Sequence, residues 1–403
     1  MGSLADKAHE EAIVYMMQVV MVEAGVPFRP CGIRDYVEVL CGAMPEGTAC
    51  RCHIDVPEKG VTRAHPMTMM AARHQVVRCV KRLPSARLVH AHYNDFSWNG
   101  IRSFENCYDL FLRACPMPHF ITLHEHPWFR NLHVWDNPRT LADYVFAWAA
   151  GQYPVPKSLP LDVLLRHRGI HVHQRWLKNA LCDNGVPGEM VAVIPLFVPE
   201  CNAPDHAIAA FKEQYNVGGN RLLVASGFVF ERKCYERILT LLPNLPDDVT
   251  FCVLGGINGR GSELYMKKLH SLAEQLGVTS RFVVTGYLSE PEMNAGMLAA
   301  TAFVAPYGEV SASASVARCI AAGAPIITGE CRTFSELIEN GAGLLSVDAS
   351  CPDQLLGGIK RVLDDSELVT HMRQLNMRYA ESNSVTACCS QFIGWYAERM
   401  DVT

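Results

Sequence analysis

Between residues 302 and 328 the chain reads AFVAPYGEVSASASVARCIAAGAPIIT, and this pattern identifies a fold class. The apolar run at 302–305 predicts a buried strand of a parallel sheet, and Pro306 ends it. A small polar loop rich in serine follows. Residues 316–323 place apolar side chains at helical spacing and stop at a glycine, and 324–328 predicts the next strand. Strand, serine-rich turn, helix and strand together predict a βαβ unit.

The start of the predicted helix has the properties of a phosphate site. The first N–H groups of a helix lack partners within the helix and carry partial positive charge, which favours an anion. Ser313, Ala314 and Ser315 lie at this start and add two hydroxyl groups. Ser313 and Ser315 could instead serve only as N-caps of the helix. The residues alone leave both interpretations open.

Composition restricts the class of protein. The 403 residues suffice for two domains, and 49% hydrophobic with 19% charged residues is typical of a soluble globular chain. The net charge of −5 argues against a general nucleic-acid binder. The 16 cysteines show no paired spacings and 1–7 begins no secretory signal, so we expect reduced cysteines in a cytoplasmic protein. No apolar run reaches the roughly 18 residues that a membrane helix needs.

The first half of the chain alternates predicted strands with predicted helices. Strands are predicted at 13–22, 50–56, 88–93, 120–126, 170–173 and 190–196. Several of them end in polar residues, and open α/β sheets place their ligands at such strand ends. His124, Glu125 and His126 end one strand, but neighbours in a strand point to opposite faces, so we expect no metal site there.

Residues 65–83 predict an amphipathic helix with a basic face. Such a helix usually connects two strands and exposes its charged face to solvent, and we favour this interpretation. It could also lie on an anionic membrane surface, which would make the protein membrane-peripheral.

The alternation of strands and helices starts afresh at Arg221. The largely polar segment before it, 199–219, is interpreted as a linker between domains. Alternating strands and helices with right-handed crossovers predict two doubly wound α/β domains.

The segment at 302–328 resembles the donor-binding segment of GT-B glycosyltransferases of the retaining family-4 type, the glycogen synthase and mannosyltransferase-like group. Proline, a short loop, small residues and a helix that ends Ala-Ala-Gly-x-Pro-Ile-Ile carry this resemblance, which extends in order over residues 13 to 400. It implies a GT-B fold, with two Rossmann-like domains and an inter-domain cleft. The implied domains are an acceptor-side domain at 1–199, a nucleotide-sugar-binding domain at 200–380, and a last helix at 381–403 that returns to the first domain.

The resemblance implies roles for residues that match the family's motifs. Gly227 and Lys233 match the motif Gly-Arg-x-x-x-x-Lys-Gly, whose basic residues hold the donor diphosphate. Phe228 stands at the Arg position and Cys234 at the last Gly, so Arg232 could supply the missing charge. A cation there would stabilise the charge that builds on the leaving diphosphate. The alternative is a solvated Arg-Lys pair, although cations are disfavoured at a helix start without an anion.

The predicted helix at 316–323 departs from the family at one position. Arg318 stands where the family carries a Glu that holds the nucleotide ribose, and Glu309 stands at or near the family's other Glu. A guanidinium only donates hydrogen bonds, so it cannot accept protons from the ribose hydroxyls. Arg318 can still donate to ribose oxygens, or bind a phosphate or an acidic sugar. Recognition of the ribose hydroxyls would then fall to Glu309 or Glu336, or be weak. Alternatively, Arg318 turns away and pairs with a surface carboxylate.

Three further positions complete the site that the resemblance implies. Gly32 lies in a glycine-containing loop that the family places at the inter-domain cleft. His124 matches a family histidine that lies near the donor sugar. Tyr287 ends a segment, 281–287, that contacts the nucleotide base in the family.

The resemblance implies a retaining, hexosyltransferase-type enzyme that takes its sugar from a UDP- or GDP-linked donor, with no cofactor and no metal. The acceptor, whether a glycan, a lipid-linked or a small molecule, is not identified by the residues, and nucleic acid is not expected as a partner. A GT-B epimerase-like or phosphorylase-like enzyme is one alternative. A non-catalytic relative that binds a sugar nucleotide or a partner is another, and Phe228 and Arg318 are the residues that favour it.

Overall fold

A computed structural model describes residues 19–25, 32–55, 87–93, 107–125, 159, 161–258, 260–308 and 310–400. The chain divides into two compact units. Unit 1 comprises Met1–Pro195 together with Val385–Thr403, and unit 2 comprises Leu196–Ser384.

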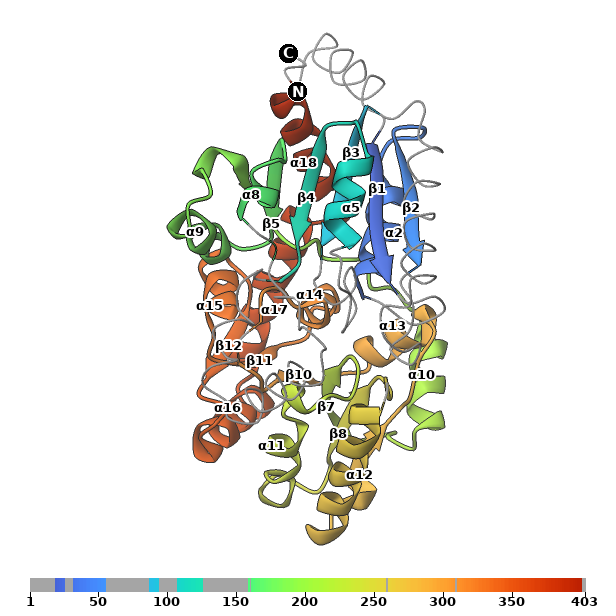
Figure 1. The fold of residues 1–403 in the computed structure, drawn as a ribbon. Coiled ribbons are helices and arrows are strands. Elements are labelled where there is room, and N and C mark those ends of the chain that lie inside the picture. The colour runs from blue at the N-terminus through green and yellow to red at the C-terminus, as the bar shows by residue number, and fades with distance from the viewer. Residues whose placement is uncertain are drawn as a thin grey trace, which may run out of the picture. The chain divides into compact units, whose positions relative to one another are not determined.

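Unit 1 contains a six-stranded parallel sheet with the strand order β2-β1-β3-β4-β5-β6, coloured blue to green in Figure 1. Its strands are β1 (Val19–Gly25), β2 (Ala49–Asp55), β3 (Leu88–Tyr93), β4 (His119–Leu123), β5 (Gly169–Val172) and β6 (Val191–Val193). Its described helices are α2 (Gly32–Ala43), α5 (Cys107–Ala114), α8 (Leu161–Leu164), α9 (Arg175–Asp183), the short η1 (Gly188–Met190) and α18 (Val385–Arg399). The order runs outward from β1 in both directions, so the sheet is doubly wound.

Unit 2 contains a second six-stranded parallel sheet, with the order β12-β11-β10-β7-β8-β9. Its strands are β7 (Arg221–Ser226), β8 (Val249–Leu254), β9 (Phe282–Val284), β10 (Ala302–Ala305), β11 (Ile326–Gly329) and β12 (Leu344–Val347). Its described helices are α10 (Asp205–Gln214), α11 (Tyr235–Leu239), α12 (Arg260–Gln275), α13 (Glu290–Leu298), α14 (Ala314–Ala321), α15 (Arg332–Glu339), α16 (Pro352–Asp364) and α17 (Ser366–Ser382), with the short helices η2 (Glu231–Lys233), η3 (Leu242–Asn244) and η4 (Thr279–Arg281). The predicted βαβ unit is β10–α14–β11, and the predicted fold class is confirmed.

The sheet of unit 2 is apolar on both faces. Leu223 and Ala225 of β7 pack into one core, whereas Leu222 and Val224 pack into the other. Helices cover both faces, as a parallel sheet requires, because its strands are buried on each side. Each fully buried aliphatic side chain contributes about 1.5–3 kcal/mol to this packing.

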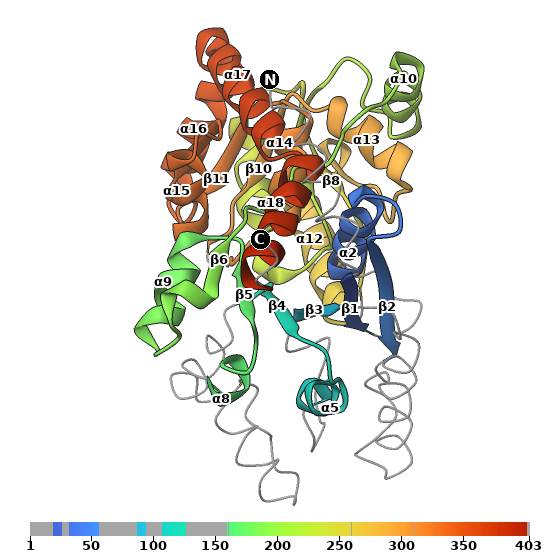
Figure 2. The ribbon, with the colours of Figure 1, turned by 90° about the horizontal axis from the view of Figure 1, so that it is seen from above.

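The sheet of unit 1 has one apolar face and one face rich in histidine. The apolar face carries the core that includes Val20, Val89 and Ile121. The other face carries His90, and α18 covers it with aromatic rings, as the ring of Tyr396 lies 5.6 Å from that of His90. Figure 2 shows α18 in red over the central strands of unit 1.

A glycine in β5 allows α18 to pack closely against this sheet. A Cβ atom on Gly169 would lie 2.5 Å from the indole of Trp395. A side chain larger than hydrogen at this position would therefore displace α18 or its tryptophan.

Several predictions differ from the structure. The segment 199–219 is not only a linker, because Asp205–Gln214 forms helix α10, which packs Phe211 into a core of unit 2. The predicted strand at 13–22 overlaps β1 (Val19–Gly25), which continues three residues further, and 13–18 lie outside the described residues. Cys52 is disulfide-bonded, so the expectation of reduced cysteines is wrong for this residue. The predicted helix at 65–83 lies outside the described residues.

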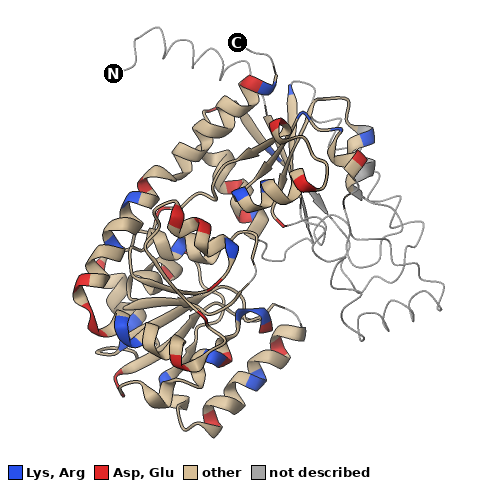
Figure 3. Cartoon of the chain, turned by 90° about the vertical axis from the view of Figure 1, so that its left-hand side faces the viewer, with Lys and Arg blue, Asp and Glu red and all other residues tan. Residues whose placement is uncertain are grey.

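Charged side chains of both signs are interspersed along the helices of unit 2 (Figure 3). No helix in the described part of the chain is both long enough and apolar enough to cross a membrane.

Candidate functional site

The candidate site lies in unit 2, where β7 ends beside the start of α14. Gly227 follows β7 with a φ of +107°, and a Cβ there would meet the Ser315 hydroxyl oxygen at 3.0 Å. Gly255 follows β8 with a φ of +152°, and a Cβ there would lie 2.1 Å from the carbonyl oxygen of Gly227. Only glycine combines these backbone angles with such a close approach. At the carboxyl-terminal ends of β7 and β8, the surface is therefore formed by backbone atoms without side chains.

Lys233 brings a positive charge to this edge. It ends η2, and its ammonium nitrogen donates to the Ser315 hydroxyl oxygen over 3.3 Å. The same nitrogen lies 4.2 Å from the ring centroid of Tyr307, which is cation–π geometry. Lys233 therefore lies beside the start of α14, and its contact with a donor diphosphate stays a prediction.

Two serines form the start of α14. Ser313 is its N-cap, and its hydroxyl oxygen accepts the N–H of Val316 over 3.2 Å. The hydroxyl of Tyr307 lies 2.9 Å from the same oxygen. Ser315 does not cap the helix; its hydroxyl accepts the bond from Lys233. We call Lys233, Tyr307, Ser313 and Ser315 the lysine–serine cluster.

The lysine–serine cluster can bind an anion. It offers an ammonium group, two serine hydroxyls and the first N–H groups of α14 within one short span. Beneath it lies a hollow of only about 10 Å³, lined in part by Ser226, Ser315 and Cys319. This space holds at most about one water molecule, so a phosphate would bind outside this hollow. Burial raises the pKa of the Cys319 thiol, which therefore stays protonated.

Cys234 follows Lys233 in the left-handed conformation, with a φ of +53°. Non-glycine residues pay a conformational cost there, and the family motif has glycine at this position. Cys234 therefore takes a backbone conformation that glycine would take without this cost.

Arg318 lies on α14 and pairs with Glu290 of α13. Its two terminal nitrogens donate to the two carboxylate oxygens over 2.6 and 3.0 Å. The Glu290 side chain is 59% exposed. This is the surface pair that the second interpretation of Arg318 describes, and a role of Arg318 toward a ligand stays a prediction.

The other positions predicted for the donor are more dispersed. Tyr287 is 71% exposed, beside Gly286. Arg232 is exposed, and its guanidinium carbon lies 5.7 Å from the ring centroid of Phe230. Glu336 is buried within α15.

Two further predicted positions begin helices. Ala314 is the exposed first residue of α14, and Gly32 is the exposed first residue of α2 in unit 1. Glu309 lies outside the described residues, as does His126.

His124 lies in unit 1 at the end of β4, inside a chain of three imidazoles. The His92 Nδ1 and His124 Nε2 atoms are 3.2 Å apart, and the His124 Nδ1 and His173 Nε2 atoms are 3.4 Å apart. The His173 Nδ1 atom lies 3.4 Å from the Ile194 carbonyl oxygen. A carbonyl only accepts, so for neutral rings each bond has one direction: His92 donates to His124, His124 to His173, and His173 to Ile194.

A second directed chain runs beside the first. His171 Nε2 donates to the same Ile194 oxygen over 2.8 Å, so its Nδ1 must accept from the Thr122 hydroxyl at 2.8 Å. Thr122 in turn accepts from His90 Nε2 at 2.7 Å. The Tyr396 hydroxyl of α18 therefore donates to His90 Nδ1. This network fastens α18 to the sheet by hydrogen bonds as well as by apolar packing.

The histidine network requires neutral rings. Burial, together with the neighbouring imidazoles, lowers the pKa of His90, His92, His124 and His171 well below the ordinary value. Burial also lowers the pKa of His173 to about 4. Of these histidines, only His124 is among the site residues predicted from the sequence. The other histidines could have been found from their spacing. In each of three strands, polar residues stand two positions apart, and residues with this spacing point to the same face of a sheet.

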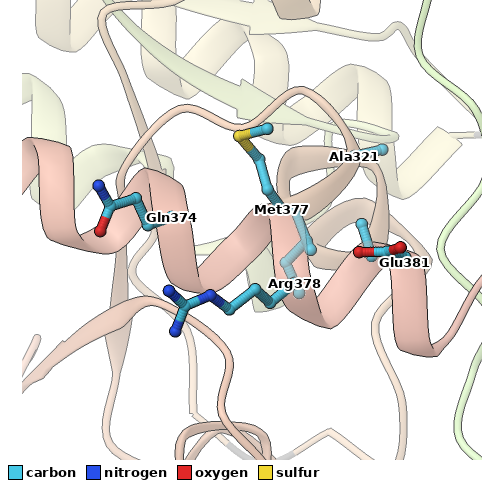
Figure 4. A pocket seen from close by; sticks show the side chains of 7 residues that line it. Ala321, Gln374, Met377, Arg378 and Glu381 are labelled. Carbon is cyan, nitrogen blue, oxygen red and sulfur yellow. The ribbon is translucent and has the colours of Figure 1, made fainter.

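A larger hollow of about 590 Å³ lies between α14 and α17. Its lining residues are Ile320, Ala321, Gln374, Met377, Arg378, Ala380 and Glu381, several of which Figure 4 shows along α17. None of the predicted site residues lines it. Within the described residues, no group of three or more His, Cys, Asp or Glu side chains could hold a metal ion.

Comparison with known proteins identifies one family model. The model "Glycosyl transferases group 1" matches residues 208–377, which lie within unit 2 and contain the lysine–serine cluster. No curated protein matches the chain.

Solved structures of similar fold cover nearly the whole chain. HepE from Anabaena in complex with UDP-glucose has 15% identity and a TM-score of 0.69, and covers 95% of this chain and 99% of its own. Sucrose-phosphate synthase from Thermosynechococcus elongatus has 14% identity and a TM-score of 0.69, with coverage of 96% and 100%. A glycosyltransferase from Rickettsia africae has 11% identity and a TM-score of 0.71, with coverage of 96% and 99%. The chain therefore has the GT-B glycosyltransferase fold, and the family match in its second half supports a glycosyltransferase.

Proposed function

We propose that the protein transfers a hexose from a nucleoside-diphosphate sugar to an acceptor, with retention of the anomeric configuration. The observation that carries this proposal is the lysine–serine cluster, an ammonium group held at the start of α14 within the residues that match the family model. Retention is proposed from the resemblance to family-4 enzymes alone.

In this proposal the donor diphosphate binds above the lysine–serine cluster. The N–H groups at the start of α14 and the hydroxyl of Ser313 would hold one phosphate. The Lys233 ammonium would stabilise the negative charge that develops on the leaving diphosphate as the bond to the sugar breaks. Gly227 leaves room for this, because any side chain there would fill the space beside Ser315 and Lys233.

UDP is the nucleotide we propose first, and GDP second. HepE from Anabaena has been solved with UDP, with UDP and glucose, and with UDP-glucose. The exposed ring of Tyr287 is the side chain we propose for contact with the base. The acceptor remains a glycan, a lipid-linked molecule or a small molecule, and we propose a cytoplasmic protein that could contact a membrane through 65–83.

For His124 we propose contact with the donor sugar as a neutral imidazole. Its Nδ1–H is committed to His173 and its Nε2 to His92. A ring so fixed would act through its shape and position rather than as an acid or base.

A non-catalytic relative is the second candidate. The observation that favours it is the bond between Arg318 and Glu290, which occupies a side chain on the helix where the family carries its ribose-binding Glu. Such a protein would bind a nucleotide sugar or a partner without turnover.

The test is calorimetry with UDP and GDP, followed by measurement of UDP-glucose hydrolysis. Lys233→Ala should weaken nucleotide binding by roughly 1.5–3 kcal/mol, because a charge-assisted bond to phosphate is lost. Lys267→Ala, which removes an exposed lysine of α12, is the matched control and should change nothing. Binding without turnover would favour the second candidate. Absence of binding to any nucleotide would exclude the proposed transferase and leave a non-catalytic relative that binds a partner.

A further inference from the structure

Tyr307 joins the two groups that make the candidate phosphate site. It follows β10 and is 4% exposed. Its ring face lies 4.2 Å from the ammonium nitrogen of Lys233, and its hydroxyl lies 2.9 Å from the hydroxyl oxygen of Ser313. One side chain therefore contacts both the cation and the N-cap of α14.

The surroundings of Tyr307 fix its position without any ligand. The ring of Phe334 in α15 lies 5.7 Å from its own ring. Gly329, at the end of β11, approaches so closely that a Cβ there would lie 2.6 Å from the Tyr307 carbonyl oxygen. The preceding residue, Pro306, accepts a 3.0 Å hydrogen bond from Arg237. Tyr307 is therefore a rigid element against which other side chains are placed.

The hydroxyl of Tyr307 can orient the proton of Ser313. The Ser313 oxygen has two acceptor positions, and the N–H of Val316 takes one of them. When Tyr307 donates to the second, the oxygen can accept no more, and the Ser313 proton must point elsewhere. The Ser313 hydroxyl is then a donor, which is the role that an anion at the helix start requires.

The ring of Tyr307 can hold the Lys233 ammonium. A lysine side chain has four carbon–carbon bonds of free rotation, and ordering it costs conformational entropy when a ligand binds. Attraction to the ring and the bond to Ser315 order the ammonium before the ligand arrives. The ligand then meets a charge already in place.

We propose that Tyr307 is a positioning residue for the donor diphosphate. Its ring places the Lys233 ammonium, and its hydroxyl orients the Ser313 hydroxyl. This inference rests on the proposed function for the identity of the ligand as a nucleoside diphosphate. The two parts act through different atoms, so two substitutions separate them. Tyr307→Phe removes the hydroxyl and keeps the ring, whereas Tyr307→Leu removes both.

Binding measurements use UDP, uridine and inorganic pyrophosphate as probes of the whole chain. Tyr307→Leu should bind UDP and pyrophosphate about 3- to 30-fold more weakly, while uridine binding, which involves no phosphate, should not change. Tyr307→Phe should lose less, about 2- to 10-fold, because only the orientation of one hydroxyl is lost. Lys267→Ala, which removes an exposed lysine of α12, is the control and should bind all three probes like the native chain.

A spectroscopic measurement tests the ring contact without any ligand. Lysines carrying ¹³C-methyl groups give separate NMR signals, and Lys233→Arg identifies the signal of Lys233. An ammonium over a ring face is shielded by the ring current, so its methyl signal should lie upfield in the native chain and in Tyr307→Phe. The upfield position should disappear in Tyr307→Leu. A loss of folding would instead bring all lysine methyl signals to nearly the same position, so the separation of the remaining lysine signals reports whether the variant is folded.

The outcomes separate this inference from the proposed function. If the native chain binds pyrophosphate and the variants weaken it, but no nucleotide binds, the inference holds and the proposed function fails. If a folded Tyr307→Leu variant binds UDP and pyrophosphate like the native chain, the inference fails and the proposed function stands. Absence of pyrophosphate binding to the native chain, or a Lys233 signal that does not depend on the ring, also overturns the inference.

Discussion

Lowering the pH from 7 to 5 should destabilise unit 1 through its buried histidines. An exposed histidine has a pKa near 6.5, and burial lowers that of His167 and of His173 to about 4. The unfolded chain therefore takes up protons that the folded chain does not. The stability of unit 1 is unaffected above pH 6.5 and falls as the pH drops from 6.5 toward 4.

The size of the effect follows from these values. At pH 5, a pKa of about 6.5 unfolded and about 4 folded costs about 2 kcal/mol per histidine. Two such groups remove about 4 kcal/mol, and His90, His92 and His124 act in the same direction. A domain is stable by only about 5–15 kcal/mol, so unit 1 should be close to unfolding at pH 5. Glu23, whose lowered pKa arises mainly from bonds to His53 and Arg51 against the effect of burial, adds to the loss only below its ordinary pKa.

Tryptophan fluorescence measures this unit selectively. All six tryptophans, at positions 98, 128, 135, 148, 176 and 395, belong to unit 1. Urea titrations followed at pH 7 and pH 5 should show a loss of unfolding free energy of at least about 4 kcal/mol. His167→Gln should remove about 2 kcal/mol of this difference, because one buried imidazole is gone. Exposed His206→Gln, in unit 2, is the control and should leave it unchanged. A difference below about 1 kcal/mol in the native chain would refute the requirement for neutral histidines.

Three substitutions test other parts of the structure. Cys234→Gly should raise the thermal stability of unit 2 by about 0.5–1 kcal/mol, because glycine adopts the left-handed conformation at φ +53° without strain; a lower melting temperature would contradict this. Arg318→Glu places a carboxylate opposite Glu290 and should cost less than about 1 kcal/mol, with UDP affinity unchanged in calorimetry. A changed affinity or donor preference would instead show that Arg318 faces the ligand. His124→Ala should lower UDP-glucose turnover and leave UDP binding intact, and full turnover would assign His124 a purely structural role.

Much of the fold could be predicted because its signals are local. Apolar runs located the strands, and the segment 302–328 gave the βαβ unit with its serine-rich turn. Helix α10 was missed because Pro199 and Pro204 and a polar composition dominated the segment, although Ala207, Ile208 and Phe211 have helical spacing.

The contacts within the sites depend on tertiary structure. Glu290 pairs with Arg318 from another helix, 28 positions earlier, so the local sequence of α14 gives no hint of it. The ring of Tyr307 meets Lys233 only because β7 and β10 are neighbours in the sheet, an order that crossovers set. The histidine network likewise needs the register of β3, β4 and β5, which single-sequence patterns do not provide.

Unit 1 is made of two separate segments of the chain, so a ribosome synthesises its last helix only after the whole of unit 2. The sheet of unit 1 is complete in sequence by Val193, but the helix that covers its histidine face, α18, begins only at Val385. Roughly 190 residues of unit 2 are synthesised in between, which takes about 10–40 s at 5–20 residues per second. During this interval α18 is not yet available to cover the histidine face, whereas the last strand of unit 2, β12, is complete by Val347, before α18 begins. The nascent chain should therefore complete its second unit before its first, and a chaperone that binds apolar surface would have its longest opportunity on the face that α18 later covers.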